Sequence, residues 1–199
     1  IEEMIEFHER LIEATGMVNG EIYTQITRGS GVYGLAFPEM SIPHLAMFAI
    51  PTDREALEAK REKGVNVITE EDIRWQHCDL NSLNRMPEVM ARQKAFISNA
   101  FDALFVREDK ITESTEASFV IYKDGILWTH PENNMIHKNI TRRLLKERLA
   151  PDMDLQIMER PFTKDFALQA EEAFLCSPRY EFMPVTKIDR SFINEGKTG

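Results

Sequence analysis

The stretch EDIRWQHCDLNSLN, residues 71–84, joins a strand-like segment to a helix-like segment. The run VNVITEEDIRW (65–75) predicts a buried strand that ends in a polar turn. The run MPEVMARQKAFISNA (86–100) predicts a helix, and Pro87 suits its first turn because the N–H that proline lacks has no partner there. A strand that ends in such a turn often presents a reactive side chain. This turn instead carries Asn81, an amide with no useful pKa.

Composition and charge exclude several classes of protein. The 199 residues are 43% hydrophobic, enough for a core, and carry a formal net charge of −9 with a pI near 5.1. An acidic chain argues against nucleic acid and against acidic membrane surfaces, because both bind basic faces. The sequence contains no apolar run long enough for a membrane span and opens with no signal-peptide pattern. Cys78 and Cys176 lack CxxC spacing, so we expect free thiols and a cytoplasmic protein.

The histidines give no sign of a metal site. The sequence has five of them, and their spacing matches neither HxxxH nor HExxH. We therefore predict no bound metal.

The pattern of apolar residues predicts a mixed α+β protein. Strands and helices alternate irregularly, with a hairpin turn at KDG (123–125) and no strict βαβ order. The charged run TDREALEAKREKG (52–64) breaks the apolar pattern and predicts a solvated connection between two domains. The predicted helices are 1–17, 86–100, 139–150 and 163–170, and the predicted strands are 20–29, 44–51 (buried), 65–75, 102–109, 110–125, 126–131, 155–162, 172–177 and 184–188.

Three stretches combine polar residues with the end of a strand or the start of a helix. They are EEDIRWQHCDLNSLN (70–84), KITE (110–113) and THPENNMIHKNITRR (129–143). In the third, the free N–H groups of a helix that starts at Ile140 and Thr141 make a candidate anion site. Simpler interpretations stay open: Asn139 as the N-cap of that helix, and Glu113 as a solvated residue in a turn between two strands.

Taken together and in this order, the motifs resemble those of one family. The chain is similar to the class IV, fold-type IV pyridoxal-phosphate aminotransferases, most of all to the bacterial D-amino-acid (D-alanine) aminotransferases. The resemblance runs from Glu6 to the end of the chain. The matching stretches are IYTQITRG (22–29), EDIRW (71–75), CDLNSLN (78–84), KDGIL (123–127) and THPENNMIHKNITR (129–142).

The resemblance implies an α+β fold with a small α+β domain followed by a larger pseudo-barrel domain. Pyridoxal 5′-phosphate would lie between them in a homodimer that acts on an amino acid and a 2-oxo acid. On this basis residues 1–52 are the end of the small domain, and residues 53–199 are most of the large one. Family groups that reach the cofactor phosphate and the substrate precede this part, so we expect the chain to be a fragment.

The resemblance also explains why a strongly framed turn carries Asn81. In the family, a lysine at this position forms a Schiff base with pyridoxal phosphate and moves the proton of the substrate α-carbon. An amide can do neither. The loss of a positioned acid–base group alone costs about 100- to 10,000-fold in rate. We therefore expect little or no turnover from this chain.

Other residues match the cofactor contacts of the family. Glu113 matches the glutamate that pairs with the pyridine nitrogen and keeps the ring protonated. His137 stands where the family has an apolar residue on the ring, so it could stack there or serve as a substitute base. Ile140 and Thr141 match the residues that hold the phosphate, and Ser177 matches another residue on the phosphate side.

Two further regions depart from the family. After Ser177 the family has small hydroxyl residues, whereas Pro178 has no N–H to donate to a phosphate. Arg179 either replaces that donor electrostatically or blocks the site. On the substrate side, Tyr33 and Leu35 take the places of an Arg and a His, and neither can form a charge-assisted pair with a carboxylate.

Two hypotheses of different class follow. The first is a D-amino-acid transaminase whose lysine is missing. The second is a non-catalytic relative that binds pyridoxal phosphate or a phosphorylated metabolite, or acts as a dimer partner. The simultaneous departures at Asn81, Pro178, Arg179, Tyr33 and Leu35 favour natural divergence over an engineered change. Aminodeoxychorismate lyase and branched-chain aminotransferase, which share the fold, also use the lysine, so Asn81 counts equally against both.

Overall fold

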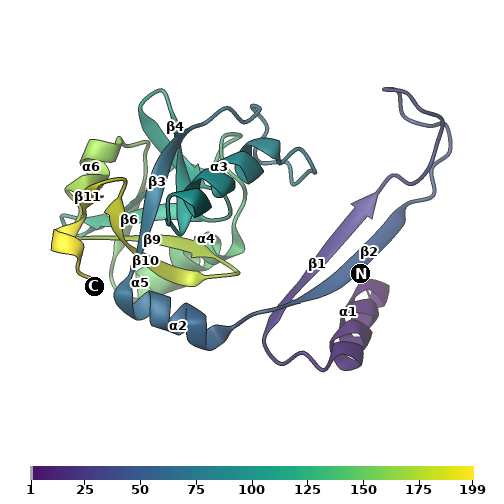
Figure 1. Ribbon diagram of the computed structural model, residues 1–199, viewed down its shortest axis with the longest axis horizontal. Helices are drawn as coiled ribbons and strands as arrows, with labels where there is room; N and C mark the ends of the chain where they lie inside the picture. Colours follow the sequence, from purple (N-terminus) through teal and green to yellow (C-terminus); the bar gives the residue numbers. More distant parts are fainter. Residues whose placement is uncertain (1) are drawn as a thin grey trace. The chain divides into compact units, whose positions relative to one another are not determined.

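The first segment of the chain folds into one helix and a two-stranded antiparallel sheet (Figure 1). Helix α1 (Glu2–Thr15) ends at Gly16, whose φ of +62° favours a residue without a Cβ. Strands β1 (Gly20–Thr27) and β2 (His44–Pro51) pair along their whole length. The computed structural model describes residues 2–199, and this first unit extends to Ala56.

Strand β2 is more exposed than its apolar sequence predicts. Phe48 stacks on Tyr23 of β1 with ring centroids 4.9 Å apart, yet half of its surface remains exposed, and Leu45 is also exposed. The prediction of a buried strand at 44–51 is therefore wrong. The physical reason is that a two-stranded sheet buries little, and within residues 2–56 the element that packs on it is α1.

The second unit, Leu57–Gly199, is built on a nine-stranded mixed sheet (Figure 1). Its strands are β3 (Val65–Glu71), β4 (Asp102–Arg107), β5 (Lys110–Ser114), β6 (Ser118–Lys123), β7 (Ile126–Thr129), β8 (Gln156–Glu159), β9 (Glu172–Ser177), β10 (Glu181–Ile188) and β11 (Ser191–Phe192). Their order is β5-β4-β3-β10-β9-β6-β7-β8, with β11 beside β10. Phe162, just after β8, bridges to Ile111 of β5, so the two edges of the sheet meet and the sheet curls on itself.

Helices cover parts of this sheet. They are α2 (Arg54–Lys63), α3 (Met86–Ile97), α4 (Ile140–Leu144), the π-helix η1 (Leu145–Leu149), α5 (Ala150–Asp152), α6 (Lys164–Leu168) and the 3-10 turn η2 (Asn194–Gly196). Helix α3 packs on β4 and β3 through small side chains, because Ala91 and Ala95 lie against Ala103 and Phe105. The predicted helix at 139–150 begins as expected, but it contains a π-helical turn and continues to Asp152.

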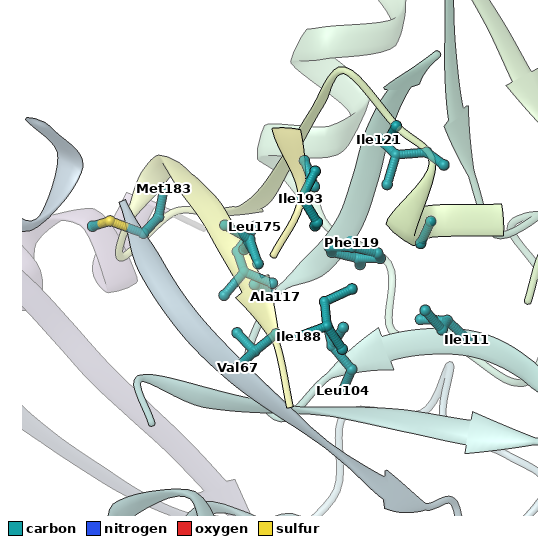
Figure 2. Close-up of a cluster of buried hydrophobic side chains, with 14 of the residues drawn as sticks. Val67, Leu104, Ile111, Ala117, Phe119, Ile121, Leu175, Met183, Ile188 and Ile193 are labelled. Carbon is teal, nitrogen blue, oxygen red and sulfur yellow. The ribbon is translucent and has the colours of Figure 1, made fainter. Parts of the chain in front are cut away.

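One cluster of apolar side chains ties the strands together (Figure 2). Val67, Leu104, Phe119, Leu175 and Ile188 come from five different strands, and each is at most 1% exposed. Burying each side chain contributes about 1.5–3 kcal/mol of transfer free energy. This shared core confirms the α+β class predicted from the sequence.

The charged run at 52–64 contains the division between the two units, after Ala56, as predicted, but it is a helix and not an open linker. It forms α2, whose first turn is capped because the Ala56 N–H donates to Asp53 Oδ1 at 2.9 Å. Leu57 packs on the core of the second unit. Arg61 donates to the backbone carbonyls of Tyr180 and Phe182, both at 3.0 Å.

Several predicted strands have different limits in the structure, and for two of them a side-chain hydrogen bond gives the reason. The strand at 65–75 stops at Glu71, because the Arg74 N–H turns back to Asp72 Oδ1. The strand at 110–125 is divided into β5 and β6, because the Ser114 hydroxyl oxygen accepts the Ala117 N–H and closes a turn. Glu113 therefore lies in β5 and not in a turn.

Two further findings concern partners. Within residues 2–199, helices long and apolar enough to cross a membrane are absent. In the same part of the chain, His, Cys, Asp and Glu side chains form no group of three that could hold a metal ion.

Candidate functional site

A buried carboxylate lies at the centre of the candidate site. Glu113 is 4% exposed and belongs to β5. Arg74 donates from Nη1 to its Oε1 at 2.5 Å, and the His137 N–H donates to both carboxylate oxygens at 3.0 Å. Burial raises the pKa of Glu113 to about 7, because loss of hydration outweighs the positive charge of Arg74. The solvated interpretation of Glu113 is therefore wrong.

Arg74 cannot fully neutralise the negative charge of Glu113, because its guanidinium also binds a second carboxylate. Its Nε and Nη2 donate to Asp72 at 2.9 and 3.0 Å, and its guanidinium lies over the Phe105 ring. Burial raises the pKa of Asp72, but the bonds and charge of Arg74 and the charge of Arg107 outweigh that effect and hold the pKa below its usual value. Asp72 thus stays ionised, whereas Glu113 can hold a proton near neutral pH.

Sequence reasoning missed this ion cluster. Thr112 completes it, since its hydroxyl donates to Asp72 at 3.1 Å and accepts from Arg74. A signal was present in the DIR triplet, because Asp72 and Arg74 are charged residues on either side of one apolar residue at the end of a buried strand. That signal becomes meaningful only once Thr112 and Glu113 are known to lie beside it.

His137 connects Glu113 to the turn that carries Asn81. Its ring lies close enough to the backbone of Cys78, three residues before Asn81, for that backbone to raise its pKa. Burial and the nearby charge of Arg85 lower the pKa of His137, which favours the neutral ring. The turn is fastened by Asn134, whose carbonyl accepts the Cys78 N–H at 2.8 Å. Asn81 itself is exposed.

The start of α4 is closed by a side chain of the same chain. Asn139 is the N-cap, and its Oδ1 accepts the N–H of Thr141 at 2.9 Å and that of Arg142 at 3.3 Å. Its Nδ2 donates to the Cys176 carbonyl at 2.5 Å and to the Ser118 hydroxyl at 3.3 Å. The N-cap interpretation of Asn139 is confirmed. The expected anion-binding N–H of Thr141 is consequently already bonded, while the Ile140 side chain is exposed.

The turn after β9 is occupied in a similar way. Ser177 is buried, and its hydroxyl oxygen accepts the Tyr180 N–H at 3.2 Å. Arg179 pairs with Glu116 at 3.0 Å, and the Tyr180 hydroxyl donates to the same carboxylate at 2.8 Å. Arg179 is therefore engaged by an acidic side chain of the neighbouring loop.

The two predicted substrate-side residues belong to the first unit. Tyr33 and Leu35 lie in the loop between β1 and β2, and both side chains are exposed. In the same loop, the Arg28 guanidinium lies 3.4 Å from the centroid of the Phe37 ring.

Within the second unit, the structure brings most of the predicted site residues together in two groups. Glu113 and His137 lie beside the turn that carries Asn81. Thr141 and Ser177 lie around Asn139, which bonds the N–H of Thr141 and the carbonyl of the residue before Ser177.

Comparison with known proteins decides the family. A sequence model described as "Amino-transferase class IV" matches residues 1–188. The chain belongs to the class IV aminotransferase family. D-alanine aminotransferases of Staphylococcus epidermidis and of Staphylococcus aureus are 40% and 37% identical to it over 200 residues. Each alignment covers 100% of this chain and 70% of the relative.

Solved structures of class IV enzymes share the fold. A branched-chain amino acid aminotransferase of Escherichia coli matches with a TM-score of 0.84 at 19% identity. A second branched-chain enzyme, from T.th. and solved with pyridoxamine 5′-phosphate, matches with a TM-score of 0.84 at 24% identity. Each match covers 100% of this chain and 66% of the solved structure. The curled mixed sheet is therefore that of fold type IV.

Pyridoxal phosphate, the cofactor that the family implies, fits only one end of this site. At the ring-nitrogen end, Glu113 is a buried carboxylate with capacity left for one more donor. At the other end Asn81 cannot form an imine, and the phosphate side is closed by Asn139 and by the Arg179–Glu116 pair. The residues present do not fit a covalently held pyridoxal phosphate.

Proposed function

We propose that this chain is a non-catalytic relative of the D-amino-acid transaminases that binds a pyridine ring of the vitamin B6 type without a covalent bond. The observation that carries the proposal is Asn81. It stands in a turn fastened to the Glu113 site through Cys78 and His137, at the position of the family lysine. The frame of a catalytic turn is kept, whereas the amine that both forms the imine and moves the proton is replaced by an amide.

The residues around the ring support binding without turnover. Glu113 accepts a ring N–H, and Arg74 and the His137 N–H hold its carboxylate in place. The neutral His137 ring offers an aromatic face beside it. His137 is poorly suited to replace the missing base, because burial and the charge of Arg85 disfavour its protonated form and so make it a weaker base.

A visible spectrum of the purified chain with pyridoxal, which has the ring and the aldehyde of the cofactor without its phosphate, tests the proposal. We expect saturable binding with the spectrum of unreacted pyridoxal and no covalent adduct at the turn after sodium borohydride, as mapped by peptide mass spectrometry. Asn81→Lys is expected to gain a reducible adduct at residue 81, and Asn81→Gln, which keeps an amide, is not. An absence of binding in both the natural chain and Asn81→Lys would contradict the proposal.

The competing function is transamination of a D-amino acid with a 2-oxo acid. It is favoured by the curated relatives, which are named D-alanine aminotransferases. Coupled detection of pyruvate from D-alanine and 2-oxoglutarate separates the two functions. We expect no pyruvate above background for the natural chain, whereas steady turnover would establish the competing function.

We also infer that the chain associates with a second copy of itself. The support is one face of α3, which turns large apolar side chains away from the sheet that its alanines contact. These exposed side chains are Met86, Val89, Met90, Phe96 and Ile97. Their spacing of three, four and seven residues places them on one stripe of the helix.

A further inference from the structure

The end of the candidate site that would receive a phosphate is already filled by groups of the protein itself. Asn139 uses both ends of its side-chain amide there. Its oxygen takes the N–H groups of Thr141 and Arg142, and its nitrogen donates to the Cys176 carbonyl and the Ser118 hydroxyl. Swinging Asn139 aside to admit an anion would break bonds to α4, β6 and β9 together. We therefore treat it as a fixed closure of the helix start.

The neighbouring turn offers a phosphate few free donors. Pro178 has no N–H, and the Tyr180 N–H is directed to the Ser177 oxygen. The two segments lie together, because Ser118 of β6 pairs with Cys176 of β9 in the same sheet. Three N–H groups that could bind a phosphate, those of Thr141, Arg142 and Tyr180, are thus used, and Pro178 offers none.

A fixed negative charge adds to this closure. Burial raises the pKa of Glu116, but the Tyr180 hydroxyl and the charge of Arg179 outweigh it and hold the pKa below its usual value. Glu116 therefore remains a carboxylate at neutral pH, two residues before Ser118. A phosphate dianion placed here would meet that charge, and Arg179, which could have offset it, is paired with Glu116.

We propose that the ligand of this site is an unphosphorylated pyridine of the pyridoxine type, held through its ring nitrogen by Glu113 and excluded from carrying a phosphate by Asn139 and Glu116. The proposal rests on the proposed function, which supplies the ring-binding role of Glu113. It reverses the usual preference of a cofactor site for the phosphate ester.

Titration of the purified chain with pyridoxine and with pyridoxine 5′-phosphate tests the preference. Neither compound has an aldehyde, so neither forms imines with surface lysines, and isothermal titration calorimetry reports both affinities directly. We expect pyridoxine to bind at least as tightly as its phosphate ester, and Glu113→Gln to weaken both. A phosphate ester that binds tenfold tighter or more overturns this inference and leaves the proposed function standing. If neither compound binds, the proposed function fails and this inference fails with it.

Substitutions at Asn139 locate the cause. Asn139→Gly frees two N–H donors, so the affinity for pyridoxine 5′-phosphate should rise about tenfold or more. The affinity for pyridoxine should stay the same. Asn139→Ser keeps an uncharged oxygen that can cap the same helix start, so it should leave both affinities close to those of the natural chain. Thermal unfolding of both variants checks that they are folded under the conditions of the titration. An unchanged preference in folded Asn139→Gly overturns the role given to Asn139.

Discussion

Arg74 and Glu113 are joined by a 2.5 Å hydrogen bond in a place where neither residue is more than 7% exposed. The pair is not balanced in charge, because the same guanidinium also binds Asp72 through two nitrogens. One cation therefore serves two buried carboxylates, with Arg107 assisting only Asp72. Burial raises the pKa of Glu113 and the shared Arg74 does not offset it, whereas Arg74 and Arg107 together outweigh burial and hold the pKa of Asp72 below its usual value.

Replacing Arg74 should destabilise the fold strongly. Arg74→Met keeps most of the side-chain volume but leaves Asp72 and Glu113 buried without their shared cation, at a cost of about 3–5 kcal/mol. Urea unfolding followed by circular dichroism measures the loss. Arg143→Met is the matched control, because Arg143 is exposed and its pairing with Glu147 is at 3.8 Å, so we expect less than about 0.5 kcal/mol there. Equal losses in both variants would contradict the shared-cation arrangement.

The raised pKa of Glu113 makes stability depend on pH in a defined direction. The folded state holds the proton up to about pH 7, whereas the unfolded chain releases it near the ordinary value of 4.5. The unfolded state therefore binds fewer protons between these values, and the contribution of Glu113 to stability falls as pH rises from about 4.5 to about 7. The unfolding free energy of the natural chain, relative to that of Glu113→Gln, should therefore be higher at pH 5 than at pH 8. A difference that grows in the opposite direction would show that Glu113 is ionised throughout.

The sequence predicted the elements whose signals are local. Apolar residues at every second position located the strands β3, β4 and β9, because one face of a strand is buried. Apolar residues three to four positions apart located helix α3, because one face of a helix is buried. The capping role of Asn139 was also accessible, since an N-cap acts on residues two and three positions ahead.

The features that the sequence did not reveal depend on distant partners. The buried state of Arg74 requires Thr112 and Glu113, which are 38 and 39 residues away. In the sequence, helix α2 looked like a linker, because the residues that hold it in place have distant partners. Leu57 packs against the core, and Arg61 donates to the backbone of Phe182 in β10. The roles of Asn81 and Glu113 came from the family resemblance, since an amide in a turn and an acid in a strand carry no local signal of a cofactor site.

The anchoring of α2 gives a further prediction. Arg61→Ala removes the charged donors to the carbonyls of Tyr180 and Phe182, which should cost about 1–3 kcal/mol. Hydrogen–deuterium exchange should rise along residues 54–63 with little change in β4 or β6. Glu62→Ala, one position away on the same exposed helix, serves as the control and should change stability by less than about 0.5 kcal/mol. An α2 that exchanges equally in the two variants would mean that Arg61 does not hold it.

The apolar stripe of α3 gives the last prediction, which concerns association. Phe96 and Ile97 are 74% and 70% exposed, and Val89 is 60% exposed on the same stripe. These apolar side chains would be removed from water if the stripes of two copies packed together about a twofold axis. In such a dimer the same patch forms both sides of the interface. Sedimentation velocity of the natural chain should therefore show a dimer that dissociates on dilution. The double variant Val89→Glu/Phe96→Glu should remain monomeric, since like charges would face each other across the axis. Phe192→Glu adds a charge at a similarly exposed aromatic residue on β11 and should leave the dimer intact. A natural chain that stays monomeric at every concentration would assign the α3 stripe to another partner.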